Sequence, residues 1–99
     1  MIRGTTPTIS FNVPYPQNEL ASLYLTIKQG REVVIEKTLD DVEISEGVAT
    51  CKLSQAETLR LDADKAVDVQ CRIKTITNEA IASNIVRDNA GRILKDGEI

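Results

Sequence analysis

The sequence predicts an all-β domain, a β-sandwich or small barrel of about seven strands with one short helical turn. Three observations support this fold class. Apolar and polar residues alternate in short runs, turn-forming residues interrupt these runs about every eight to twelve positions, and a single helix-capping motif occurs. Side chains of a strand point to opposite faces in turn, so each run has one apolar face for a core and one polar face for solvent.

The first half of the chain is expected to form five strands. Residues 21–29 give the clearest pattern, because every second side chain from Leu23 to Ile27 is aliphatic. Gly30 follows this strand and can supply the positive φ of a hairpin turn. The third strand is less regular, since Lys37 falls on its nominal inner face. The other four strands are expected at residues 6–13, 32–39, 42–45 and 48–53.

The second half is expected to contain the helical turn and the longest strand. The sequence Ser-Gln-Ala-Glu at residues 54–57 is a capping box, in which the serine hydroxyl and the glutamate carboxylate each accept a backbone N–H of the other residue. A helical turn is therefore expected over residues 54–60. Residues 66–76 form the longest clean alternation, and a last strand begins near Ala80.

Charge and hydropathy argue against two classes of partner, nucleic acid and membranes. The 99-residue chain has a net charge of −3, and residues 36–68 hold nine acidic and four basic residues. An acidic middle third repels nucleic acid, so we expect a solvated acidic face, with docking onto a basic partner as the alternative. No apolar run approaches the roughly 20 residues of a membrane span, and the N-terminus carries no secretory signal. We therefore expect a soluble protein, made in a cytoplasm, with neither nucleic acid nor membrane as a partner.

The sequence offers little material for catalysis. Histidine, the commonest general base and metal ligand, is absent. Cys51 and Cys71 are expected to be buried thiols, although a disulfide stays possible if their strands face each other. Two acidic clusters, Asp40, Asp41 and Glu43 in the first and Asp62 and Asp64 in the second, are expected to be solvated turns. The second lacks the glycine and distal glutamate of a calcium loop. We expect no enzymatic activity, no cofactor and no metal site.

Several stretches resemble a group of small proteins encoded by phages and prophages of Gram-positive bacteria. The resemblance spans nearly the whole chain, and its strongest parts are residues 1–14, 23–30, 53–59, 80–86 and 91–97. The layout is also similar to the immunoglobulin-like N-terminal domain of phage baseplate upper proteins. In that domain a first strand precedes a hairpin, a helical turn of the pattern Ser/Thr-x-x-Glu-Thr follows, and a long strand closes the sheet.

This resemblance implies an immunoglobulin-like β-sandwich over residues 1–94, followed by a free C-terminal tail at residues 95–99. It also implies a non-enzymatic structural protein of the virion, made in the bacterial host and assembled with other virion proteins in several copies. The chain shows no coiled coil or receptor-binding domain of its own. We therefore expect an adaptor or decorating subunit of the tail or baseplate region.

The expected interface combines both termini with an edge strand, because unblocked edges and exposed apolar ends suit assembly. Its candidate residues are Met1, Ile2, Arg3, Thr8, Tyr15, Arg92, Ile93, Leu94 and Ile99. Two alternatives stay open. A module that binds host-surface glycan or protein would depend on Tyr15 and Tyr24, since aromatic residues are scarce. A prophage-encoded intracellular regulator would dock its acidic face onto a basic host protein.

Overall fold

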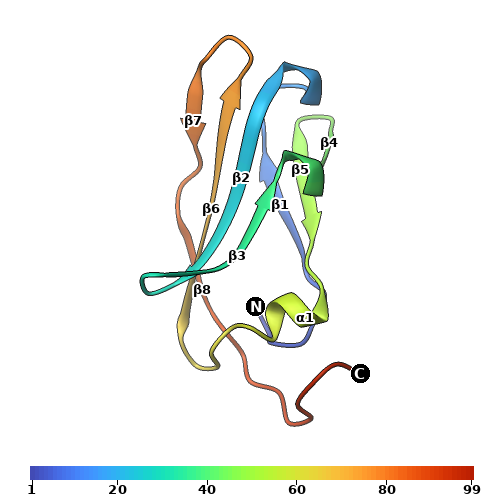
Figure 1. Cartoon of the computed structure of the whole chain (residues 1–99), viewed down its shortest axis with the longest axis vertical. Helices are drawn as coiled ribbons and strands as arrows, with labels where there is room; N and C mark the ends of the chain where they lie inside the picture. Colours follow the sequence, from blue (N-terminus) through green and yellow to red (C-terminus); the bar gives the residue numbers. More distant parts are fainter.

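Two antiparallel sheets pack face to face in the computed structural model, which describes residues 1–99 (Figure 1). The all-β sandwich expected from the sequence is confirmed. The first sheet has the strand order β1 (Thr8–Asn12), β5 (Val48–Lys52) and β4 (Glu43–Ser45). The second has the order β3 (Glu32–Thr38), β2 (Leu20–Gln29) and β6 (Ala66–Thr75), and both β7 (Ala80–Ala82) and β8 (Val86–Asn89) pair with the far side of β6.

The strand order is that of an immunoglobulin sandwich without its first strand. In that fold one sheet runs A-B-E-D and the other contains C-F-G, with C′ added beside C in variable-type domains. Here β1, β5 and β4 take the places of B, E and D, and no strand lies where A would pair with β1. The N-terminal residues instead reach the second sheet, where Ile2 forms an isolated parallel bridge with Gly91.

The core lies between β2 and β6 on one side and β1 and β5 on the other. The register pairs Leu25 with Cys71 and Ile27 with Val69, so the alternating side chains of the two longest strands share the inner face. The buried apolar cluster is almost wholly aliphatic, as the scarcity of aromatic residues requires. Its members are Val13, Leu20, Leu23, Leu25, Ile27, Ile35, Val42, Ala49, Cys51, Leu53, Leu61, Val67, Val69, Cys71, Ile73 and Ala90.

Two hairpins follow from local turn chemistry. Gly30 has φ of 60° between β2 and β3, as expected. Glu46 and Gly47, with φ of 51° and 78°, form the two-residue loop between β4 and β5, in which both positions are left-handed as in a type I′ turn. The β2–β3 pairing also contains a bulge, at which Val34 is the extra residue. The bulge interrupts the alternation of inner and outer side chains in this strand, which accounts for its less regular pattern.

The helical turn confirms the capping box. In α1 (Gln55–Thr58) the Glu57 amide donates to Ser54 Oγ at 3.1 Å, and the Ser54 amide donates to Glu57 Oε1 at 2.9 Å. Thr58 is fully buried, and its hydroxyl donates to the Thr5 carbonyl at 2.8 Å. Two short 3₁₀ turns, η1 (Gln17–Glu19) and η2 (Leu39–Asp41), connect strands of different sheets.

The C-terminal part differs from a simple last strand and tail. Ser83 divides the strand into β7 and β8, so the sandwich has eight strands. Its amide donates to the Cys71 carbonyl at 2.8 Å, and its hydroxyl accepts from the Cys71 amide at 3.0 Å, which keeps both pieces on the β6 edge. The tail also contacts the domain, because the Ile99 amide donates to Gln55 Oε1 at 2.9 Å.

Candidate functional site

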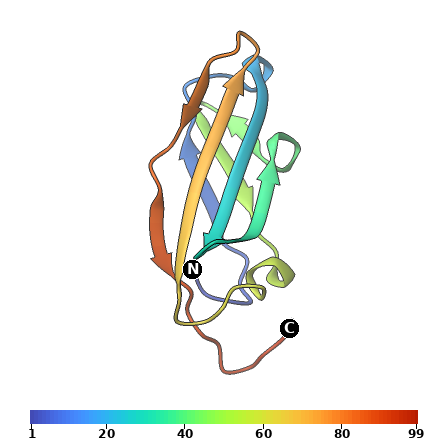
Figure 2. The same cartoon turned by 60° about the vertical axis from the view of Figure 1, so that its left-hand side comes forward.

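Both termini lie at one end of the sandwich, beside α1 (Figures 1 and 2). The Met1 amino group pairs with the Asp88 carboxylate and donates to the Asn89 carbonyl at 3.1 Å. The Gly91 amide donates to the Met1 carbonyl at 2.8 Å, and the Arg3 amide donates to the Gly91 carbonyl at 3.0 Å. The structure therefore joins the first residues directly to the strand end that precedes the C-terminal arm.

The two arginines of the expected interface are engaged within the chain. The Arg3 guanidinium donates to the carbonyls of Leu61 and Leu59 at 2.6 and 3.0 Å, which satisfies two carbonyls at the end of the helical turn. Arg92 pairs with the Asp64 carboxylate. Arg3 holds the N-terminal segment against the helical turn, and Arg92 ties the start of the C-terminal arm to the loop before β6.

Apolar side chains remain exposed at this terminal end. Ile93 packs beside Gly4, where an added Cβ would lie 3.0 Å from Ile93 Cδ1. In contrast, Leu94 is fully exposed, and Ile2 and Ile99 are also exposed. We call Ile2, Leu94 and Ile99 the terminal apolar group. The structure brings these three expected interface residues to one end, where Leu94 and Ile99 are almost fully exposed and Ile2 is half-exposed.

Tyr15 and Tyr24 do not form one binding surface. Tyr15 lies at the opposite end, where its hydroxyl donates to Glu79 Oε2 at 2.7 Å, and this hydrogen bond raises the pKa of Tyr15. Tyr24 is on the outer face of β2, opposite Thr38 of β3 and Arg72 of β6. The two rings expected for a glycan platform thus face different surroundings.

The free edge of β1 is the second exposed feature. The Val13 amide bonds to the Gly47 carbonyl at 2.8 Å and the Leu53 amide to the Pro7 carbonyl at 2.9 Å, so the odd-numbered residues of this strand face β5. The main-chain groups of the intervening residues, Thr8, Ser10 and Asn12, point away from the sheet. Thr8 is therefore the first residue of an unpaired edge.

An apolar cleft lies beside this edge. It has a volume of about 150 Å³ and opens between β1 and β7, which lie on the same side of the sandwich (Figure 2). Phe11 from β1 lines one wall, and Ile73 and Ile81 line the other. The register places Ile81 opposite Ile73 and Val86 opposite Val69, on the inner face of the second sheet. Val86 is nevertheless 59% exposed, because no strand lies over it. We call this region the open side.

The other long side is closed by polar contacts that sequence reasoning did not foresee. Lys37, on the inner face of β3, forms an ion pair with Glu57 of α1 at 2.5 Å, and each side chain is 17% exposed. Burial alone would raise the pKa of Glu57, but hydrogen bonds from Lys37 and from the Ser54 amide outweigh it and hold this pKa below its usual value. The same bond raises the pKa of Lys37. The misfit of Lys37 in the alternation was the signal for this contact.

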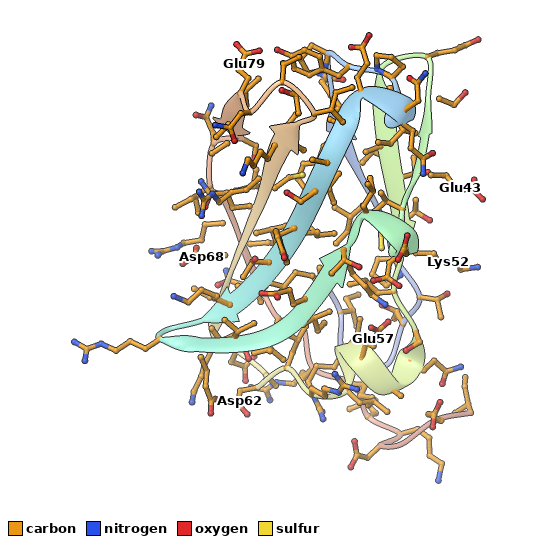
Figure 3. The ribbon with its side chains drawn as sticks, turned by 45° about the horizontal axis from the view of Figure 1, so that its top comes forward. Glu43, Lys52, Glu57, Asp62, Asp68 and Glu79 are labelled. Carbon is orange, nitrogen blue, oxygen red and sulfur yellow. The ribbon has the colours of Figure 1, made fainter.

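Most acids of the middle third have partners within the chain. Asp41 accepts from the Thr38 amide at 2.9 Å, Asp64 pairs with Arg92, and Asp68 forms a two-point contact with Arg87 at 2.8 and 3.0 Å. Figure 3 shows Glu43 pointing away from the sandwich. The acids that stay exposed without an ion pair in this region include Asp40, Glu43 and Glu46.

The two cysteines are buried and unpaired, as expected. Burial raises the pKa of both thiols, which keeps them protonated at neutral pH and unreactive. No helix of the structure has the length and apolar character needed to cross a membrane. Comparison with protein-family models, with curated proteins and with solved structures gives no match.

Proposed function

We propose that this chain is a non-enzymatic structural protein of a phage particle, an adaptor or decorating subunit of the tail or baseplate region that acts through protein–protein contacts. The observation that carries the assembly role is the terminal apolar group. Leu94 and Ile99 belong to an arm that is hydrogen-bonded to Gln55, and Ile2 is exposed where the N-terminal segment pairs with Gly91 at the same end. Apolar side chains gathered at one end of a domain are typical of a surface that another protein covers.

The neighbouring polar groups support this interpretation. Arg3, Arg92 and the Met1 amino group are all satisfied within the chain, so a partner that covers this end would not leave these three charges buried without a partner. Covering the three apolar side chains would contribute about 1.5–3 kcal/mol each if burial were complete. That amount suits attachment to a larger assembly, in which several copies bind together.

The phage particle itself is proposed from the sequence resemblance. Immunoglobulin-like sandwiches perform many functions, so the fold alone does not select one. The resemblance of residues 1–14, 23–30, 53–59, 80–86 and 91–97 to proteins of phages and prophages favours a virion location over the two alternatives. A host-surface binder is less favoured because Tyr15 and Tyr24 do not converge.

The test is incorporation into particles. We expect mass spectrometry of purified virions to detect the chain, and Leu94→Asp to lower its abundance there at least about tenfold while its melting temperature stays unchanged. Ile76→Asp is the matched control, because Ile76 is also exposed but lies at the opposite end, next to the β6–β7 turn. Absence of the wild-type protein from virions would overturn the proposal, and so would equal loss of both variants.

A further inference from the structure

The edge of β1 has unpaired main-chain groups that another strand could bond to. The main-chain groups of Thr8, Ser10 and Asn12 point outward, and no hydrogen bond in the structure uses them. Pro14 lacks an N–H, so the row of outward donors ends at Asn12. The exposed ladder thus spans β1 and matches a segment of about five residues.

The second sheet supplies a floor for such a strand. Because the position outside β1 lies over β7 and β8, a strand added there would cover Ile81 and Val86, which face inward but lie beneath no strand of the first sheet. The cleft beside Phe11 would receive one of its inward side chains. Hydrogen bonds on one side and apolar contact beneath are the two components of strand addition.

Charge distinguishes this edge from the β3, β4 and β8 edges, and length distinguishes it from β7, which has three residues against five in β1. No charged residue occurs between Arg3 and Glu19, a stretch that contains all of β1. The edges of β3, β4 and β8 carry charges that discourage pairing, namely Glu32 and Glu36 on β3, Glu43 on β4, and Arg87 and Asp88 on β8. The β1 edge is therefore complementary to an uncharged segment, since a charge placed over its apolar floor would be buried without a partner.

We propose that the free edge of β1 binds an extended, uncharged segment of a partner protein as an added strand, with apolar residues at alternate positions facing Ile81 and Val86. This proposal rests on the assembly role proposed above and names the kind of partner. The site occupies the place of strand A in an immunoglobulin sandwich, which this chain leaves empty because its N-terminal residues pair with Gly91 instead.

A second folded copy fits this site less well than a single strand. If β1 paired with β1 of another copy, the first sheets of the two copies would join edge to edge. In each copy β7 and β8 lie beneath the free edge of β1, so these strands of the two copies would overlap. An isolated segment carries no second sheet and avoids this overlap. The site therefore favours a short, uncharged segment.

The test titrates the full ¹⁵N-labelled chain with a capped peptide that has the sequence of residues 6–13, Thr-Pro-Thr-Ile-Ser-Phe-Asn-Val. This probe is uncharged and alternates apolar residues at its last positions. We expect amide shifts along β1 and along β7 and β8. Ser10→Pro, which removes only an outward donor, and Val86→Lys should each weaken binding at least about tenfold. Val33→Lys, at a comparably exposed valine on the β3 edge, is the matched control and should bind like wild type.

Three results would overturn the proposal: no shifts at millimolar peptide, shifts confined to β3 or β4, or dimerisation of the chain through β1 in light scattering. Val86→Lys keeps the test decisive if Ser10→Pro fails to fold, since Val86 is exposed. Particle composition separates this proposal from the proposed function. If the chain is found in virions but does not bind the peptide, only the strand-binding proposal is refuted. If the chain is absent from virions but binds the peptide, only the proposed virion role is refuted.

Discussion

The two long sides of the sandwich are closed in different ways. On one side the chain itself crosses from β3 through η2 to β4, and the Lys37–Glu57 pair joins β3 to α1 beneath this crossing. On the open side, β1 and β7 come from opposite ends of the sequence and no segment of the chain crosses between them along their length (Figure 2). Apolar side chains there stay partly exposed.

This difference shows how one alternating pattern produces two kinds of surface. Every strand contributes an apolar face, but a face becomes core only where another strand covers it. Ile35 on the closed side is buried, whereas Val86 on the open side is 59% exposed although it also points inward. Coverage, and not residue type, decides which apolar residues are available to a partner.

The largest effect is expected from a charge placed in the core next to the open side. Ile73→Asp and Val69→Asp should each unfold the domain, because an unpaired carboxylate would be buried in β6 at a cost of about 4 kcal/mol or more, a large part of a typical total stability. Both positions are buried. Circular dichroism and thermal melting would measure this, and a near-native melting temperature for Ile73→Asp would show that the open side admits enough water to solvate the charge.

Breaking the ion pair of the closed side should have the next largest effect. Lys37→Met leaves the Glu57 carboxylate poorly solvated and without its main partner, and should lower the free energy of unfolding by about 2–3 kcal/mol. The double variant Lys37→Met/Glu57→Gln should recover part of that loss. Urea denaturation measures both, and a double variant no more stable than the single one would contradict the coupling.

The same pair predicts a pH dependence. The pKa of Glu57 is lower in the folded chain than its usual value, so the stabilisation is present above about pH 4.3 and is lost as pH falls through the lower folded value. The free energy of unfolding should therefore fall more steeply below about pH 4.3 in wild type than in Glu57→Gln. Urea denaturation at a series of pH values measures this. If the free energy of unfolding falls equally steeply at acidic pH in both proteins, protonation of Glu57 is not coupled to folding.

A matched pair of valines compares the two sides directly. Val42→Ala, at a buried position beside η2, should cost about 2 kcal/mol, whereas Val86→Ala should change stability by less than about 0.5 kcal/mol. The chemical change is identical, so the difference mainly reports how far each side chain is covered. Equal losses in urea denaturation would mean that the open side is covered in solution, for instance by self-association.

A smaller loss than that of Val42→Ala is expected at the junction of β7 and β8. Ser83→Ala removes the hydroxyl that accepts from the Cys71 amide at 3.0 Å, and should cost about 1 kcal/mol. Hydrogen exchange should show faster exchange of the Cys71 amide than in wild type. Unchanged exchange would mean that another acceptor replaces the hydroxyl.

Sequence reasoning was most reliable where the signal is local. The strands around Leu25 and Val69, the turn at Gly30 and the capping box of Ser54 and Glu57 follow from residue periodicity and short-range hydrogen bonding. The division of the last strand at Ser83 was missed, because it depends on a bond to Cys71 that no local pattern encodes.

The candidate site was only partly predictable for the same reason. The terminal residues Ile2, Leu94 and Ile99 could be proposed from their apolar character and position. That Arg3 would satisfy the Leu59 and Leu61 carbonyls depends on which distant segments meet at that end.

The sequence by itself determined the strands as far as β6, their inner faces and the helical turn, since each arises from the alternation of side chains and from contacts a few residues apart. Only the tertiary structure decided that Lys37 would meet Glu57 and that the edge of β1 would lack a neighbour. The physical reason is that pairing and coverage depend on contacts between segments far apart in the chain, and residue periodicity carries no information about those contacts.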